Sequence, residues 1–410
     1  MTAPVIVVCL LLILAYIFDI TASKTKIPSV ILLFLLGWGV RQSTDFLGTP
    51  MPDLNKILPV LGTVGLVLIV LEGSLELELY RSKFPFVGKM TLISLLPMLA
   101  LSAGLAYAFH YLEDTPLRTG LINAIPFAVI SSAIAIPSAQ NLTANNKEFV
   151  TYESSLSDIF GVILFNFIVL NSAINARSFG IFFVDLIVIL LISITMTLGL
   201  AYLLSKIKHP VKFVPIILII VLIYEVSKEY HLPALIFILL FGLALGNLDE
   251  IKKSRIIQRL QPKILDKEVH KLKELTGEIS FLIRALFFLV FGYLLDTKDL
   301  LNPETITWAL AIVLFIYSLR IIFLKLFKLP LQPLLFIAPR GLITILLFLT
   351  IPVAQKIEVA NKSLTIQVII LTALIMMFGM LFHQKPVDSA ATPEVEESTS
   401  FEEELSDKLE

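Results

Sequence analysis

The chain has 410 residues, of which 57% are hydrophobic and only 16% are charged, and its mean hydropathy is +0.89. This composition excludes a soluble domain and indicates a membrane protein. The formal net charge of -1 gives no support to a nucleic-acid partner. The single cysteine, Cys9, excludes an intramolecular disulfide and a cysteine metal cluster.

Apolar blocks run along the whole chain and can be counted as spans, because a bilayer core takes about 20 apolar residues per helix. The thirteen blocks lie near residues 3–20, 28–40, 57–75, 88–109, 119–140, 150–172, 181–204, 211–226, 232–247, 277–295, 304–324, 331–354 and 363–382. The first block has no basic leader and no small-residue cleavage site, so it is interpreted as a retained helix.

Basic residues concentrate in one set of loops. Residues 206–212 and 252–273 are rich in Lys and Arg, whereas the loops of the other set hold isolated cations such as Arg118 and Lys228. Positively charged loops stay in the cytoplasm. The sequence therefore predicts a multi-pass protein of a bacterial-type inner membrane, with its N-terminus outside and its C-terminus cytoplasmic.

Residues 1–385 are expected to form one transmembrane domain, with a first half of about residues 1–204 and a second half that ends near residue 382. Between the halves, residues 249–276 interleave charged and apolar side chains, which predicts an amphipathic cytoplasmic helix. Residues 386–410 are rich in Glu, Ser, Thr and Pro, which predicts an acidic, disordered cytoplasmic tail.

Ionisable side chains at membrane depth are costly, so each of them marks a candidate functional position. The densest group lies in residues 151–166, TYESSLSDIFGVILFN. Ser154 and Asp158 share one helix face, and Glu153 and Ser157 share the adjacent face. A carboxylate can bind a hard cation or a proton but not both at once, so Asp158 offers a simple basis for exchanging the two.

Two spans are expected to be interrupted at membrane depth. Arg340 lies in an apolar span between a proline and a glycine, and residues 124–142 carry two prolines beside Ser131 and Ser132. Paired interrupted helices in two halves of a chain point to a transporter with inverted repeats and a midplane site. Arg340 is also the expected cation partner of Glu153.

A further carboxylate, Glu72, precedes Gly73 near the end of the third span, where it could reach the ion path. Together, the segments around Glu72, Ser131, Asp158 and Arg340 resemble the monovalent cation:proton antiporters. The resemblance is greatest to the NhaP-type sodium/proton antiporters, which are related to sodium/hydrogen exchangers. The resemblance covers most of residues 1–385 and rests on LEGSLEL, SSAIAIPSA, ESSLSDIFGVILFN and APRGLITILLFL, in that order.

The resemblance implies an all-α polytopic membrane protein of about 13 transmembrane helices. Inverted repeats and two crossing discontinuous helices, the NhaA-like antiporter fold, belong to the same expectation. The chain is then expected to be a transporter and not an enzyme. It would form a homodimer in the lipid bilayer and need no cofactor beyond the transported ions.

The resemblance also implies roles for single residues. Asp158 would bind Na⁺ or a proton. The further ligands would be Ser154, Ser131, Ser132 and Glu72, and the structural residues would be the buried pair Glu153 and Arg340 with Ser157 and Arg320. Two positions depart from the family, which usually has Asn or Asp in place of Ser157 and often Thr-Asp in place of Ser131 and Ser132. One negative charge then serves the site, which favours electroneutral exchange.

The expected function is secondary active exchange of a monovalent cation, Na⁺ first and also Li⁺, for H⁺. Alternating access with competition of the two ions at Asp158 is the expected mechanism. Several alternatives stay open on the sequence: a K⁺/H⁺ antiporter of the same fold, a channel, an organic-anion carrier and a membrane sensor that does not transport.

Overall fold

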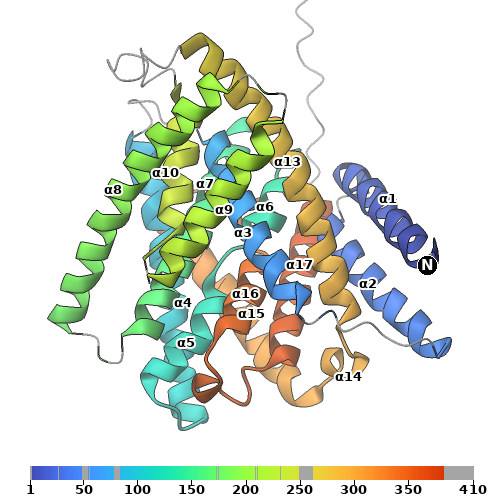
Figure 1. Ribbon diagram of the computed structural model, residues 1–410. Helices are drawn as coiled ribbons and strands as arrows, with labels where there is room; N and C mark the ends of the chain where they lie inside the picture. The colour runs from blue at the N-terminus through green and yellow to red at the C-terminus, as the bar shows by residue number, and fades with distance from the viewer. Residues whose placement is uncertain are drawn as a thin grey trace, which may run out of the picture.

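A computed structural model of the chain is built from α-helices that cross and pack in one bundle (Figure 1). The structure describes residues 2–25, 27–48, 54, 56–77, 84–171, 173, 175–207, 209, 211–230, 232–248 and 262–382. The predicted tail, residues 386–410, and the first part of the predicted linker, residues 249–261, lie outside the described residues.

The helices follow one another with short connections. They are α1 (Thr2–Thr25), α2 (Ser29–Phe46), α3 (Ile57–Glu76), α4 (Phe84–Leu112), α5 (Leu117–Ala128), α6 (Ser132–Ser138), α7 (Ala144–Leu170), α8 (Ala176–Lys206), α9 (Phe213–Glu229), α10 (Leu235–Gly246), α13 (Pro262–Tyr293), α14 (Thr297–Leu300), α15 (Pro303–Leu326), α16 (Leu342–Thr350), a 3₁₀ turn (Val353–Gln355) and α17 (Lys362–Phe382).

The predicted spans coincide with these helices. In the described part of the chain, nine helical segments are long and apolar enough to cross a membrane, counting α5 with α6 as one. The four other predicted blocks correspond to α2, α9, the short helix α10 and the interrupted segment 331–354. The protein is therefore a multi-pass membrane protein.

The helices pack as two groups. The core group contains α4, α5, α6, α7, α15, α16 and α17, and the scaffold group contains α1, α2, α3, α8, α9, α10 and α13. The two groups meet mainly where α3 lies against α6, α7 and α16. Long, mostly exposed helices flank the bundle at opposite edges, α1 at one and α8 at the other, as lipid-facing spans would (Figure 1).

Glycines let the scaffold helices approach closely. A Cβ added at Gly292 of α13 would lie 2.2 Å from the Phe34 carbonyl oxygen of α2, and one added at Gly37 would lie 2.2 Å from the Leu289 carbonyl oxygen. Small residues at such contacts are typical of helix pairs in membranes, where backbone proximity replaces hydrophobic burial as the source of association.

The boundary between linker and span differs from the prediction. Residues 262–276 are helical, but they belong to the same unbroken helix, α13, as the following span. A helix of 32 residues is about 48 Å long, which exceeds a bilayer core of about 30 Å. One helix can therefore supply both the amphipathic segment and the span, and no separate linker helix is needed for residues 262–276.

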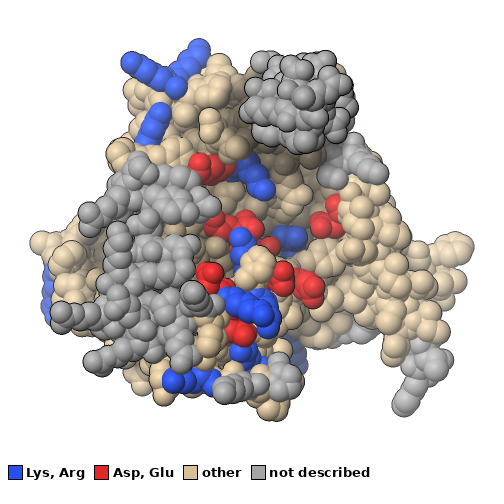
Figure 2. Space-filling view, turned by 90° about the horizontal axis from the view of Figure 1, so that it is seen from above, with Lys and Arg blue, Asp and Glu red and all other residues tan. Residues whose placement is uncertain are grey.

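The face that carries the N-terminal end of α13 is hollowed and charged. Figure 2 shows Lys, Arg, Asp and Glu side chains intermingled around the hollow. Lys212 lies 2.8 Å from a Glu268 carboxylate oxygen, and Lys273 of α13 lies 3.8 Å from a Glu76 carboxylate oxygen of α3. Glu76 thus reaches the charged face, as expected for the last turn of its helix.

Candidate functional site

The first predicted interruption separates α5 from α6. Helix α5 ends at Ala128 and α6 begins at Ser132, and the backbone between them is extended, with φ -80° and ψ 128° at Val129 and φ -80° and ψ 115° at Ser131. The two prolines of this segment lie inside the helices and not in the break. The extended backbone between α5 and α6 is therefore stabilised by contacts with other parts of the chain.

The second interruption is longer than predicted. Residues 332–336 form turns, residues 337–341 are irregular, and α16 begins only at Leu342. The predicted interruption of this span is therefore present, and it takes up residues 332–341 before the helical part. Pro330, Pro333 and Pro339 each lack a backbone donor, and three such residues within ten positions disfavour a continuous helix there.

The two breaks lie directly against each other. The backbone N–H of Ser131 in the first break donates to the carbonyl of Pro339 in the second, at 2.9 Å. The predicted meeting of the two interrupted spans is confirmed by this bond. Polar backbone from two distant parts of the chain is thereby brought to one place inside the core group.

Side chains satisfy the backbone groups that the breaks expose. The Ser157 hydroxyl of α7 accepts from the Ile130 N–H at 2.9 Å, and the Thr372 hydroxyl of α17 accepts from the Arg340 N–H at 3.1 Å. Irregular backbone at membrane depth requires such partners. The Ser157 hydroxyl therefore satisfies a backbone donor of the first break. Thr372 was not identified from the sequence, where one of two threonines in an apolar span was the available signal.

Arg340 does not form the predicted ion pair with Glu153. Its buried guanidinium donates from Nε to the Phe127 carbonyl at 2.7 Å and from Nη1 to the Ala338 carbonyl at 2.8 Å. A weaker bond of 3.4 Å reaches the Ala128 carbonyl. The positive charge thus lies at the C-terminal end of α5, where a helix dipole favours a cation.

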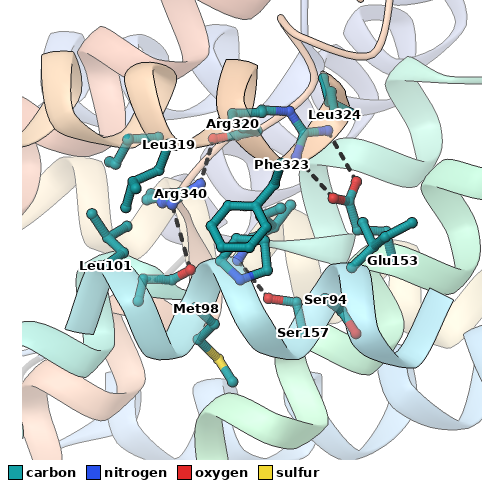
Figure 3. A pocket seen from close by; sticks show the side chains of 16 residues that line it. Ser94, Met98, Leu101, Glu153, Ser157, Leu319, Arg320, Phe323, Leu324 and Arg340 are labelled. Atoms are coloured by element: carbon teal, nitrogen blue, oxygen red, sulfur yellow. Dashed lines mark hydrogen bonds and ion pairs between the residues drawn. The ribbon is translucent and has the colours of Figure 1, made fainter. Parts of the chain in front are cut away.

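Glu153 is paired with Arg320 instead. Arg320 Nη1 lies 2.8 Å from Glu153 Oε1 and Nη2 lies 3.0 Å from Oε2, which is a bidentate pair (Figure 3). Arg320 Nε also donates to the Leu334 carbonyl at 2.8 Å. The planar fork of arginine suits this geometry. Arg320 therefore links α15, α7 and the turns at residues 332–336, which form the first part of the second break.

A small cavity lies beside these charged groups. It has a volume of about 30 Å³, and its lining includes Glu153, Ser157, Arg320 and Arg340, with Met98 among the apolar residues around them (Figure 3). A volume of this size suits one water molecule. The cavity places polar groups next to the breaks without providing room for an organic substrate.

Asp158 of α7 contacts Ser132, the first residue of α6, beside the first break. The Ser132 hydroxyl donates to Asp158 Oδ2 in a short hydrogen bond, and the Ser132 N–H lies 3.3 Å from the same oxygen. The aspartate is 1% exposed. Its other oxygen, Oδ1, and the nearby Ser131 hydroxyl have no hydrogen-bond partner in the described part of the chain. Two buried oxygens are thus available to an ion.

The structure treats the other two predicted ligands differently. The Ser154 hydroxyl is buried and donates to the Val150 carbonyl of its own helix at 2.7 Å, so only its lone pairs could serve an ion. Glu72 belongs to the scaffold group and has Arg284 and Ser280 of α13 as its polar neighbours. Helix α3, which carries Glu72, contacts α7, which carries Asp158, and the role of Glu72 as a helper carboxylate stays a prediction.

Comparisons with known proteins agree with this architecture. The sodium proton antiporter MjNhaP1 from Methanocaldococcus jannaschii at pH 8 is 18% identical and has a TM-score of 0.68, over 93% of this chain and 98% of that one. An electron-microscopy structure of the same antiporter has a TM-score of 0.65 at 18% identity, over 94% and 99% of the two chains. The predicted fold class, an all-α polytopic protein with an antiporter fold, is confirmed by this likeness. No curated protein sequence is similar enough to match.

Family membership rests on the sequence as a whole. The family model described as sodium/hydrogen exchanger, transmembrane, matches residues 9–384. The match covers twelve of the thirteen predicted spans completely, the first from residue 9 onward, and both breaks. The chain therefore belongs to the family of transmembrane sodium/hydrogen exchangers, and it is a membrane transporter and not an enzyme.

Proposed function

We propose that this protein is a secondary active antiporter that exchanges Na⁺, and also Li⁺, for H⁺ at Asp158. The observation that carries the proposal is a buried carboxylate beside two abutting helix breaks, with one of its oxygens free of any partner among the described residues. Hard monovalent cations favour oxygen ligands. Asp158 with the hydroxyls of Ser131, Ser132 and Ser154 supplies a ligand set of this kind.

Competition follows from the chemistry of a single carboxylate. A proton on Asp158 removes its charge and takes up one of its oxygens, so a cation is no longer attracted. Deprotonation restores a charged ligand. The cation and the proton must therefore each leave Asp158 before the other can bind. If the protein changes between its two orientations only with one of these ions bound, it exchanges the cation for the proton.

The buried charges favour a ratio of one cation to one proton. Glu153 and Arg320 neutralise each other in a closed pair, and Arg340 is held by backbone carbonyls. Asp158 is then the single carboxylate of this cluster that is not in an ion pair. Na⁺ and H⁺ each add one positive charge to it, so both loaded forms carry the same charge and exchange is electroneutral.

Alternating access would come from movement of the core group against the scaffold group along α3. Asp158 belongs to the core group, so its exposure to the two sides changes as the groups shift. Within this proposal the N-terminus lies outside, the C-terminus is cytoplasmic, and two copies associate through their scaffold groups, as the family resemblance implies.

The test is a pH-dye assay in proteoliposomes with NaCl, LiCl and KCl added in turn. Wild type should show proton movement driven by Na⁺ and Li⁺, and Asp158→Asn should show none. Asp296→Asn, which removes an exposed carboxylate paired with Arg41, is the matched control and should retain exchange. A voltage clamp imposed with K⁺ and valinomycin, applied in the NaCl experiment, should leave the rate unchanged.

Other outcomes would reassign the function. A response to K⁺ that exceeds the Na⁺ response would identify a K⁺/H⁺ antiporter. Exchange that persists in Asp158→Asn would remove Asp158 from the mechanism. The wild-type protein, folded and inserted, could also show no response to any cation between about pH 6 and 9. That result would refute antiport and favour the sensor or the organic-anion carrier.

A further inference from the structure

A third buried oxygen without a partner lies close to the proposed site. The hydroxyl of Ser155 on α7 is sealed from solvent and has no hydrogen-bond partner in the described part of the chain. Its neighbours Ser154 and Thr151 on the same helix both donate to backbone carbonyls, at 2.7 Å and 2.9 Å. Serines in helices commonly make such bonds. A buried hydroxyl that makes none requires a separate explanation.

Ser155 lies on the same seam as Asp158. Helices α6 and α7 run antiparallel: Ser132 of α6 contacts Asp158 of α7, and Ile136, one turn further along α6, approaches the Ser155 region from the same side. Residues three apart on a helix share a face and are separated by about 4.5 Å along the axis. The Ser155 hydroxyl is therefore about one helical turn from the carboxylate, toward the N-terminal end of α7.

The other wall of this position belongs to the scaffold group. A Cβ added at Gly73 of α3 would lie 3.0 Å from the Ser155 hydroxyl oxygen and 4.0 Å from Ile136 Cδ1. Ser155 thus lies where α7 of the core group faces α3 of the scaffold group. The residues of α3 that follow Gly73 lead to Glu76 at the charged face of Figure 2. A movement of one group against the other would change the surroundings of this hydroxyl.

We propose that the Ser155 hydroxyl is a cation ligand on the route between Asp158 and the charged face. It would bind a monovalent cation, directly or through one retained water, as the ion passes along the seam between α3 and α7. The inference rests on the proposed function, because it assumes that Asp158 is the inner binding position. Ser155 would then be a cation ligand in addition to Asp158, Ser131, Ser132 and Ser154.

The experiment compares Ser155→Ala and Ser155→Cys with wild type. Cysteine preserves the size of the side chain but replaces oxygen with sulfur, which is a poor ligand for a hard cation. Ser193→Ala is the matched control, because Ser193 is fully buried on α8 and its hydroxyl already bonds to the Ile189 carbonyl. Two quantities are measured: the KM for Na⁺ and Li⁺ in proteoliposomes, and the Na⁺-dependent rise in melting temperature in detergent.

Both Ser155 variants should raise the KM for Na⁺ roughly tenfold, the effect of losing one favourable contact to a charged ligand, and change the maximal rate less than about twofold. The Na⁺-dependent melting shift should move to correspondingly higher Na⁺ concentrations. Ser193→Ala should behave as wild type in both measurements.

A KM and a melting shift within about twofold of wild type in either Ser155 variant would overturn the inference, since about 0.4 kcal/mol of binding free energy is too little for a lost ligand. Failure of the proposed function is distinguishable, because it appears as exchange that survives in Asp158→Asn. In that case the melting shift still decides whether Ser155 contributes to cation binding. If alanine prevents folding, the cysteine variant supplies the same comparison.

Discussion

Breaking the pair of Glu153 and Arg320 should destabilise the protein strongly. The two side chains are 3% and 7% exposed and are joined by bonds of 2.8 Å and 3.0 Å. Removing one partner from a buried pair typically costs about 3–5 kcal/mol, because the other charge is left without compensation. Arg320→Met should lie near the upper end of that range, since it also removes the bond to Leu334.

The assay is a double-mutant cycle on the apparent free energy of unfolding in detergent, with Glu153→Gln, Arg320→Met and the double variant. The double variant buries no charge at these positions, so it should be more stable than the sum of the two single losses predicts, by about 2–3 kcal/mol. A second cycle with Glu153→Gln and Arg340→Met is the control, and its coupling should be clearly smaller, because Arg340 lines the same cavity but makes no hydrogen bond to Glu153.

The opposite pattern of couplings would contradict a pair between Glu153 and Arg320. If the cycle with Arg320 is additive and the cycle with Arg340 is not, Glu153 is paired with Arg340 in the membrane protein and the assignment made above is wrong. Reconstitution of the double variant adds a functional criterion: if the pair is structural, the variant that folds should retain cation-driven proton movement.

Three further predictions concern packing, the break and pH. Gly292→Ala should lower the melting temperature, because overpacking against the Phe34 carbonyl costs about 1–3 kcal/mol, whereas Gly39→Ala, with nothing within 4 Å of the added Cβ, should leave it unchanged. Ser157→Ala should cost about 1–3 kcal/mol, measured by thermal unfolding, because it leaves a backbone N–H of the first break unpaired. Competition at Asp158 predicts that the KM for Na⁺ in ²²Na⁺ uptake rises about tenfold per pH unit on the acidic limb, and a KM independent of pH would contradict it.

The positions of the spans could be predicted because hydropathy reports burial in lipid directly. The break near Arg340 could be predicted for a similar reason, since proline removes a donor wherever it stands. The extent of that break was not predicted: the turns at residues 332–336 include the Leu334 carbonyl, whose partner is Arg320 of a different helix. The unbroken course of α13 was also missed, since a change from amphipathic to apolar residues is compatible with one helix as well as with two.

The partner of Glu153 shows where reasoning from the sequence stops. Arg320 and Arg340 both lie deep in late spans, and either could satisfy a buried carboxylate. The choice depends on which guanidinium the breaks already use. Because the first break leaves carbonyls at the end of α5 without partners in their own helix, the Arg340 guanidinium binds the backbone there, and Arg320 is left to bind Glu153.

The serines of α7 illustrate the same limit at the ion site. Helical spacing places Ser154 on the face of Asp158, yet its hydroxyl is bonded to its own helix, while Ser155 faces Gly73 of α3 with no bond. Periodicity identifies the face of a residue but not the helix opposite to it. A hydroxyl is available to an ion only where the opposite helix offers no hydrogen-bonding group. Here the opposite residue is Gly73 of α3, which has no side chain to bond to the Ser155 hydroxyl. Selectivity among monovalent cations should therefore respond to substitutions on α3 that never touch Asp158.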